Sequence, residues 1–183
     1  MASIKRRGGA IRVHLRPEER MVISGFAREV AELLGGTAAP DPDPLAAIVG
    51  MPAPAGEGAP ERPTDPALLR LLPDAYADDP GGAAEFRRLT EEQLRSGKAA
   101  LLVQLADDID SADELDLDDE QADAWVQALN DIRLVLGSRL GVDDDDGTWR
   151  TSLARDDERM PLVAAYDWLA GLQERLLDAL TRD

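Results

Sequence analysis

Apolar side chains recur every three or four positions between residues 118 and 140, and this is the strongest pattern in the chain. The spacing places them on one face of a helix, where they form a wide apolar stripe. Acids crowd the first turn and Arg139 lies in the last, an order that complements the helix dipole. Gly141 is a natural terminator. The pattern predicts a helix from Asp118 to Leu140 whose core face is Ala122, Trp125, Leu129, Ile132, Leu136 and Leu140.

The N-terminal part of the chain has the pattern of a short strand followed by a helix. Apolar and polar side chains alternate over residues 11–15, which is the period of a half-buried strand. Proline suits the first position of a helix. We therefore expect a helix that opens at Pro17 and runs to the glycine pair at 35–36.

Residues 36–66 hold eight of the chain's twelve prolines. Proline density denies this stretch a helix interior or a sheet centre, and its few apolar residues would bury little surface. The sequence predicts a flexible insertion here and leaves open a short ordered patch at residues 45–51. Asp65 or Thr64 is then expected to cap a short helix over residues 66–72.

Helical spacing returns at Ala83 and continues to Ile109. A capping-box pattern that begins at Thr90 leaves two alternatives open: one long helix, or two helices with a corner at Leu89. The expected core positions of this segment are Phe86, Leu89, Leu94, Leu101, Leu102, Leu105 and Ile109.

Ten acids and no base lie between Asp107 and Asp123. A run of like charges is most simply a solvated turn, here with Leu115 and Leu117 as expected anchors. Residues 142–158 are expected to form a second acidic loop. That loop is not an EF-hand, because the first and twelfth ligand positions would be Val142 and Leu153.

The last apolar pattern opens at Pro161 and predicts a C-terminal helix with a core face of Leu162, Tyr166, Leu169, Gln173, Leu176 and Leu180. Layers of amphipathic helices bury their stripes against one another. The whole pattern predicts a mainly α fold and a single domain over residues 1–183. Its architecture would be a helical bundle of four to six helices with a short N-terminal β-strand.

The composition narrows the classes of function. The net charge is −17, from 37 acids and 20 bases, which disfavours non-specific attraction to nucleic acid or anionic lipid. The chain holds no cysteine, which excludes disulfides, thiolate catalysis and sulfur-ligated metal sites. No apolar stretch reaches the length of a signal peptide or of a membrane span. We expect a soluble cytoplasmic protein.

Residues with catalytic chemistry are scarce. His14 is the only histidine, so neither a histidine pair for a metal nor a conventional catalytic triad can be assembled. The glycine pairs do not match a phosphate-binding loop. We expect no catalytic residue, no cofactor and no metal. Asn130, Asp131 and Arg133 interrupt the helix over 118–140 with polar groups; a structural network between helices is the simpler interpretation, and a partner surface is the alternative.

Three segments carry a family resemblance: Phe86-Arg-Arg-Leu-Thr90, Ala128-Leu-Asn-Asp-Ile-Arg-Leu-Val-Leu-Gly-Ser-Arg-Leu-Gly141 and Tyr166-Asp-Trp-Leu-Ala-Gly-Leu-Gln173. They resemble an actinobacterial family, long catalogued as a domain of unknown function, that includes the actinomycete oxidative-stress regulator AosR. Genes of this family commonly lie beside the gene for the protease adaptor ClpS. The resemblance covers the N-terminal helix and residues 83–181, and its second segment is the most specific.

The resemblance implies a non-enzymatic regulator that acts with an extracytoplasmic-type sigma factor to raise expression of stress-response and cysteine-biosynthesis genes. A cysteine-based redox switch is associated with AosR, whereas this chain holds no cysteine. Redox sensing through a disulfide is therefore excluded here, and another input signal is expected.

A sigma factor or RNA polymerase carries basic surfaces, so an acidic surface would complement it and speed association. The residues that we expect to contact such a partner are Asp113, Glu114, Asp116, Asn130, Asp131 and Arg133. The basic segment at residues 1–16 is the competing contact, with a preference for acidic partners or DNA.

Two alternatives stay open. Direct DNA binding would use a ribbon-helix-helix start in which Arg12 and His14 read the major groove, although the following helix is long for that motif. An adaptor or scaffold in protein turnover is suggested by gene neighbourhood in the family. A homodimer is compatible with each of these functions.

Overall fold

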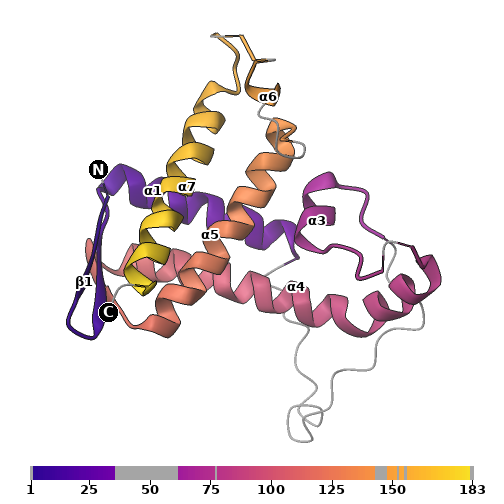
Figure 1. Cartoon of the computed structure of the whole chain (residues 1–183), viewed down its shortest axis with the longest axis horizontal. Coiled ribbons are helices and arrows are strands. Elements are labelled where there is room, and N and C mark those ends of the chain that lie inside the picture. The colour runs from indigo at the N-terminus through magenta and orange to yellow at the C-terminus, as the bar shows by residue number, and fades with distance from the viewer. Residues whose placement is uncertain are drawn as a thin grey trace, which may run out of the picture.

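The computed structural model describes residues 2–35, 62–76, 78–142, 148–151, 153–154 and 156–181. Figure 1 shows these residues as a group of helices with a small sheet at one end. The predicted mainly α fold class is confirmed. In chain order the elements are β1 (Ser3–Arg7), β2 (Ala10–His14), α1 (Pro17–Leu33), α3 (Pro66–Leu71), α4 (Pro80–Ser111), β3 (Glu114–Leu117), α5 (Asp119–Leu140), α6 (Thr148–Thr151) and α7 (Met160–Thr181).

Helix α5 lies at the centre, in contact with α1, α3, α4 and α7. Its ends form as predicted. The Asp118 carboxylate accepts a hydrogen bond from the backbone N–H of Gln121, whose side chain accepts one from the backbone N–H of Asp118. Gly141 ends the helix with a φ of 69°, a conformation that glycine adopts without a steric penalty. Trp125 is buried at the centre of the core, with 2% of its surface exposed.

The sheet has three antiparallel strands within the described residues, in the order β1-β2-β3. Gly8, at a φ of 61°, lies in the two-residue turn between β1 and β2. Val13 pairs with Leu115 on the neighbouring strand, and Ile11 pairs with Leu117. Ile11, Val13 and Leu117 are buried, so the inner face of the sheet closes one end of the core.

The strand prediction was incomplete, because only β2 was expected. Strand β1 has one large apolar residue, Ile4, among polar neighbours, and β3 lies inside the acidic run that we expected to be a solvated turn. Leu115 and Leu117 do anchor this run, as predicted: Leu117 is buried and Leu115 packs against the core. Asp116 lies between them and faces outward on this edge strand.

Helix α4 is continuous over Pro80–Ser111, so the alternative of two helices with a corner at Leu89 is wrong. The helix starts three residues before the predicted Ala83, because Asp79 caps it by accepting a hydrogen bond from the backbone N–H of Gly82. The Thr90 hydroxyl does not cap a new helix. It donates a hydrogen bond to the carbonyl of residue 86, one turn earlier in the same helix.

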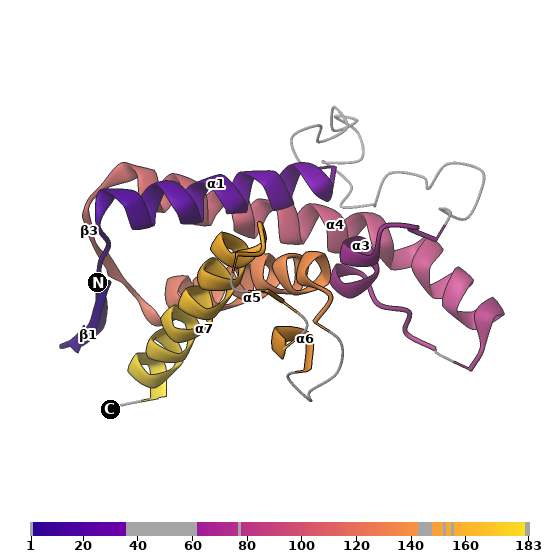
Figure 2. The same cartoon turned by 90° about the horizontal axis from the view of Figure 1, so that it is seen from above.

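The first half of α4 corrects the predicted core. Leu102, Leu105 and Ile109 are buried as expected, whereas Phe86, Leu89 and Leu94 are 44%, 63% and 42% exposed. Figure 2 shows the reason: α4 lies beside α1 along its second half and extends past α3 along its first half. Apolar spacing predicted the helix correctly but could not show where its neighbours end.

The remaining predictions concern the connecting segments. Helix α3 forms after Asp65, whose carboxylate accepts a hydrogen bond from the backbone N–H of Ala67, as predicted. Residues 36–61 lie outside the described residues, so the flexible insertion and the patch at 45–51 stay predictions. The predicted acidic loop at 142–158 contains the short helix α6, and residues 143–147, 152 and 155 of it are not described. Among the described helices, none is long and apolar enough to cross a membrane.

Candidate functional site

The acidic run at 107–123 and the basic N-terminal segment contact each other. Arg12 on β2 donates two hydrogen bonds to the Asp116 carboxylate on β3, at 2.7 and 2.8 Å, and lies 3.3 Å from Glu114. Arg20 on α1 forms an ion pair with Asp113 and donates a hydrogen bond of 2.8 Å to the backbone carbonyl of Ile109. The three acids predicted to contact a partner are therefore bound by bases of the same chain.

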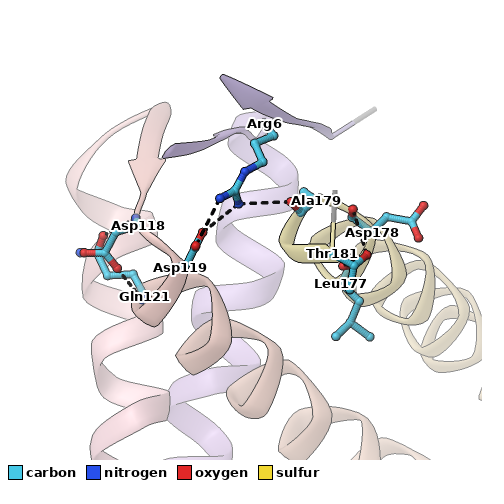
Figure 3. A network of polar contacts seen from close by, with 8 residues as sticks. All are labelled: Arg6, Asp118, Asp119, Gln121, Leu177, Asp178, Ala179 and Thr181. Carbon is cyan, nitrogen blue, oxygen red and sulfur yellow. Dashed lines mark hydrogen bonds and ion pairs between the residues drawn. The ribbon is translucent and has the colours of Figure 1, made fainter. Parts of the chain in front are cut away.

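Two more bases continue this pattern. Arg28 on α1 lies 3.3 Å from Asp107 and 2.8 Å from Asp110, near the end of α4. Arg6 reaches from β1 to Asp119 at the start of α5, at 2.8 Å, and donates a hydrogen bond of 3.3 Å to the backbone carbonyl of Ala179 on α7 (Figure 3). These bases thus link β1 to the ends of α5 and α7, and α1 to the end of α4.

These contacts change the acidity of the carboxyl groups. Hydrogen bonding to Arg12 lowers the pKa of Asp116, and hydrogen bonding to Arg6 lowers the pKa of Asp119. Both carboxylates are exposed, so each pair alone adds little stability. The side chains of Glu120 and Asp123, in contrast, form no hydrogen bond or ion pair within the part of the chain that the structure describes, and both residues are exposed.

The other predicted site residues lie beside a groove between α4, α5 and α7, which has a volume of about 420 Å³. We call it the α4–α5–α7 groove. Its polar wall comes chiefly from α5, and its apolar residues come from α4 and α5 together. The lining residues are Gln93, Leu94, Gly97, Lys98, Leu101, Val126, Gln127, Asn130, Asp131 and Gln173.

A nearly buried ion pair forms one wall of the groove. The Lys98 ammonium lies 2.7 Å from a carboxylate oxygen of Asp131, whose side chain is 3% exposed. Burial raises the pKa of Asp131, and the hydrogen bond and charge of Lys98 oppose that rise. The pair fastens the middle of α4 to the middle of α5.

Arg133 fastens α5 to α7 in a similar way. Its guanidinium donates a hydrogen bond of 2.5 Å to the Gln173 side-chain oxygen and lies 5.2 Å from the centre of the Tyr166 ring. Gln173 in turn donates to the backbone carbonyl of Val126 at 3.2 Å. Asp131 and Arg133 therefore form the structural network between helices that was the simpler interpretation. Asn130 is exposed and lines the groove.

Two residues of this site were not identified from the sequence. Lys98 lies between Leu94 and Leu101 in the helical repeat, and a base inside an apolar stripe was the available signal for a buried ion pair. Gln173 was assigned to the core face of the last helix, and it is buried there. Its hydrogen-bond partners could not be predicted, because they depend on how α5 and α7 pack.

Residues 1–180 match a family described as "Domain of unknown function (DUF2017)". The chain belongs to this family. The oxidative stress regulator AosR of Mycobacterium tuberculosis (strain H37Rv) is 33% identical over 194 residues, which cover 94% of this chain and 83% of the relative. AosR of Mycobacterium bovis has the same identity and coverage. No solved structure matches the chain.

The match confirms the resemblance and extends it, because the family covers the proline-rich stretch that we expected to lie outside it. The three segments that carried the resemblance lie on α4, α5 and α7. These are the helices that line the α4–α5–α7 groove. Within the described residues, no group of three or more His, Cys, Asp or Glu side chains is arranged to hold a metal ion.

Proposed function

We propose that the chain is a non-enzymatic regulator of the oxidative-stress response, and that it acts by binding an alternative sigma factor in the α4–α5–α7 groove. The stress role is supported by similarity to regulators of that name over 94% of the chain. The observation that carries the binding site is the position of the groove, which is lined by the three helices that hold the family segments.

The chemistry of the groove suits an amphipathic helix of a partner. Leu94, Leu101 and Val126 offer an apolar strip, while the amides of Gln127 and Asn130 offer polar contacts at its edge. An amphipathic helix binds such a surface through residues spaced three and four apart. The groove is already formed, so a partner would meet it without rearranging the core.

The charges around the groove favour a basic partner. Asp123 lies four positions before Gln127 and Glu120 lies seven positions before it, so both share its face of α5, and the side chains of both are unpaired in the described residues. Lys98 and Asp131 neutralise each other. A partner helix with bases beside its apolar face would therefore be steered to this surface by the net charge of −17 and held by the free acids.

The proposal is tested by binding to purified alternative sigma factors with Asn130→Arg and Met21→Arg. Both substitutions add one positive charge at an exposed helical position, but only the first lies in the groove. Asn130→Arg should weaken binding about tenfold or more, a loss of about 1.4 kcal/mol, and Met21→Arg should leave it within about twofold. Equal binding by both variants would refute the groove as the site.

The same proteins separate the alternatives. Direct DNA binding through a ribbon requires Arg12 to face a base edge, whereas its guanidinium is bound to Asp116 and Glu114. A gel shift at physiological salt with the unmodified chain tests that function directly. If no sigma factor binds and a pull-down recovers protease components instead, the turnover adaptor replaces the sigma-factor regulator.

A further inference from the structure

The first half of α4 presents two large apolar side chains, Phe86 and Leu89, that stay exposed in the described structure. Leu89 is 63% exposed, and Phe86 lies one turn before it and is 44% exposed. The two remain exposed although Tyr76 packs edge-to-face on the Phe86 ring, with 6.1 Å between the centroids. Single exposed apolar side chains are ordinary, but two neighbouring ones on one helix make a candidate interaction surface.

This half of the helix is held in place from its opposite face. Glu91 is buried and lies 2.8 Å from Arg95 and 3.5 Å from Arg87. Arg87 also forms an ion pair with Asp74 in the segment before α4. The helix is therefore fixed without help from the exposed face, which makes that face a preformed surface.

The charges beside Leu89 identify what fits this surface. They alternate in sign along one flank of the helix, in the order Glu85, Arg88, Glu92 and Arg95. When two copies of such a helix lie antiparallel, each acid of this alternating series lies opposite a base of the other copy. Glu92 forms no ion pair within the described residues, and Arg88 pairs only with Glu85 there. A second copy of the same helix therefore complements this flank.

We infer that the first half of α4 is a homodimer interface, in which two copies lie antiparallel about a two-fold axis beside Leu89. Such an interface is isologous, so each contact occurs twice. Leu89 packs against Leu89 of the other copy, and Arg88 faces Glu92 of the other copy. Neither Leu89 nor Arg88 lines the α4–α5–α7 groove.

The size of this surface sets the expected affinity of the homodimer. Residues 80–97 extend over about 27 Å of helix at 1.5 Å per residue. A single helix pair of this length covers less than the roughly 800 Å² per partner of a standard interface. The dimer should therefore dissociate on dilution within a range of about 1 to 100 µM, and high salt should weaken it because its charge pairs are exposed.

Sedimentation velocity of the full chain across this range tests the inference. The chain should shift from monomer to dimer as its concentration rises, and Leu89→Glu should remain monomeric. Met21→Glu is the matched control, because it adds the same charge at an exposed apolar position of α1, and it should dimerise like the unmodified chain. A monomer at every concentration, or a dimer with Leu89→Glu, would overturn the inference.

Two further variants test the antiparallel arrangement itself. Arg88→Glu and Glu92→Arg should each weaken self-association, because each places like charges opposite one another at the axis. An equal mixture of the two should form a heterodimer, because both contacts then join opposite charges. Since the chain has no cysteine, Leu89→Cys should also form a disulfide-linked dimer on mild oxidation, and Met21→Cys should not. A mixture that stays monomeric would exclude this arrangement.

Discussion

Arg12 and Asp116 lie opposite each other on β2 and β3 and are joined by two hydrogen bonds of 2.7 and 2.8 Å. This register brings the basic N-terminal segment against the acidic run at 107–123. The two segments, which the sequence presents as competing partner surfaces, are one folded unit. Removing residues 1–9 would delete β1 together with its charges, so truncation cannot separate a binding role from a structural one.

Acid should weaken this unit. Arg12 and Arg6 lower the pKa of Asp116 and Asp119 below 3.8, so the folded state binds protons less readily than the unfolded state does. The stabilisation is therefore present above about pH 4 and is lost as the pH falls through the lowered pKa values. The urea midpoint of the unmodified chain should fall between pH 5 and pH 2 by more than that of Arg12→Gln.

Lys5→Gln is the control for this comparison, because Lys5 is exposed on β1 and forms no ion pair in the described residues. Its midpoint should follow the unmodified chain at every pH. If Arg12→Gln shows the same pH dependence as Lys5→Gln, the Arg12 contacts do not contribute to acid sensitivity.

Trp125 should be the most costly single residue of the core to remove. Its side chain is 2% exposed, and its indole N–H donates a hydrogen bond of 3.0 Å to Asp108. Trp125→Ala should cost about 3–5 kcal/mol of unfolding free energy. Trp125→Phe keeps an aromatic ring but loses the hydrogen bond, and it should cost about 1–2 kcal/mol. Chemical denaturation measures both, and an unchanged midpoint in Trp125→Ala would mean that the stripe does not face the core.

The Lys98–Asp131 pair should respond unequally to loss of either partner. Lys98→Met leaves a carboxylate that is 3% exposed without its counter-charge and should cost about 3–5 kcal/mol. Asp131→Asn leaves an ammonium that still reaches water and should cost about 1–2 kcal/mol. Replacing both residues by apolar ones, as Lys98→Met/Asp131→Leu, should restore much of the lost unfolding free energy, because no buried charge remains.

The pH dependence of Lys98→Met checks the cause. Burial raises the pKa of Asp131, and removing Lys98 removes the contact that opposes this rise. A raised pKa means that the folded state holds the proton more tightly, so stability falls as the pH rises through that pKa. The cost of Lys98→Met should therefore be smaller at pH 5 than at pH 8. An equal cost at both values would show that lost packing, rather than charge, is responsible.

The parts of the fold that were predicted correctly depend on residues close together in the chain. Helix α5 is specified by Asp118, its apolar stripe and Gly141, all within about six turns. Strand β3 was missed because its partner Arg12 is 104 residues from Asp116, and a four-residue strand has little pattern of its own. The exposure of Leu89 was missed because periodicity shows that a face exists but not what covers it.

The candidate site shows the same division. Asn130, Asp131 and Arg133 were found as polar residues inside a helix pattern, which is a local signal. The groove that Asn130 and Asp131 line also needs Lys98, which is 33 residues from Asp131, and Gln173, which is 40 residues from its partner Arg133. Local sequence identified one wall of the site, and only the packing of α4 and α7 against α5 supplied the others.

The last prediction separates the acids that steer a partner from those that hold the sheet. Glu120→Gln/Asp123→Asn removes two unpaired carboxylates on the groove side of α5, whereas Asp113→Asn/Glu114→Gln/Asp116→Asn removes carboxylates bound to Arg20 and Arg12. The three acids replaced in this triple variant are those expected from the sequence to contact a partner. Both variants reduce negative charge, so both should slow association with a basic partner, by about two- to tenfold, and reduce its salt dependence.

Stability distinguishes the two variants. The urea midpoint of the double variant should change little, because Glu120 and Asp123 have no side-chain partners in the described structure and Glu120 loses only its interaction with the dipole of α5. The urea midpoint of the triple variant should fall, because Arg12 and Arg20 lose their acidic partners beside the sheet and the end of α4. Surface plasmon resonance at low and high salt, with denaturation of the same samples, measures both properties. If the double variant associates at the unmodified rate while the triple variant is slowed at an unchanged midpoint, the paired acids are themselves the contact surface, and steering by Glu120 and Asp123 is wrong.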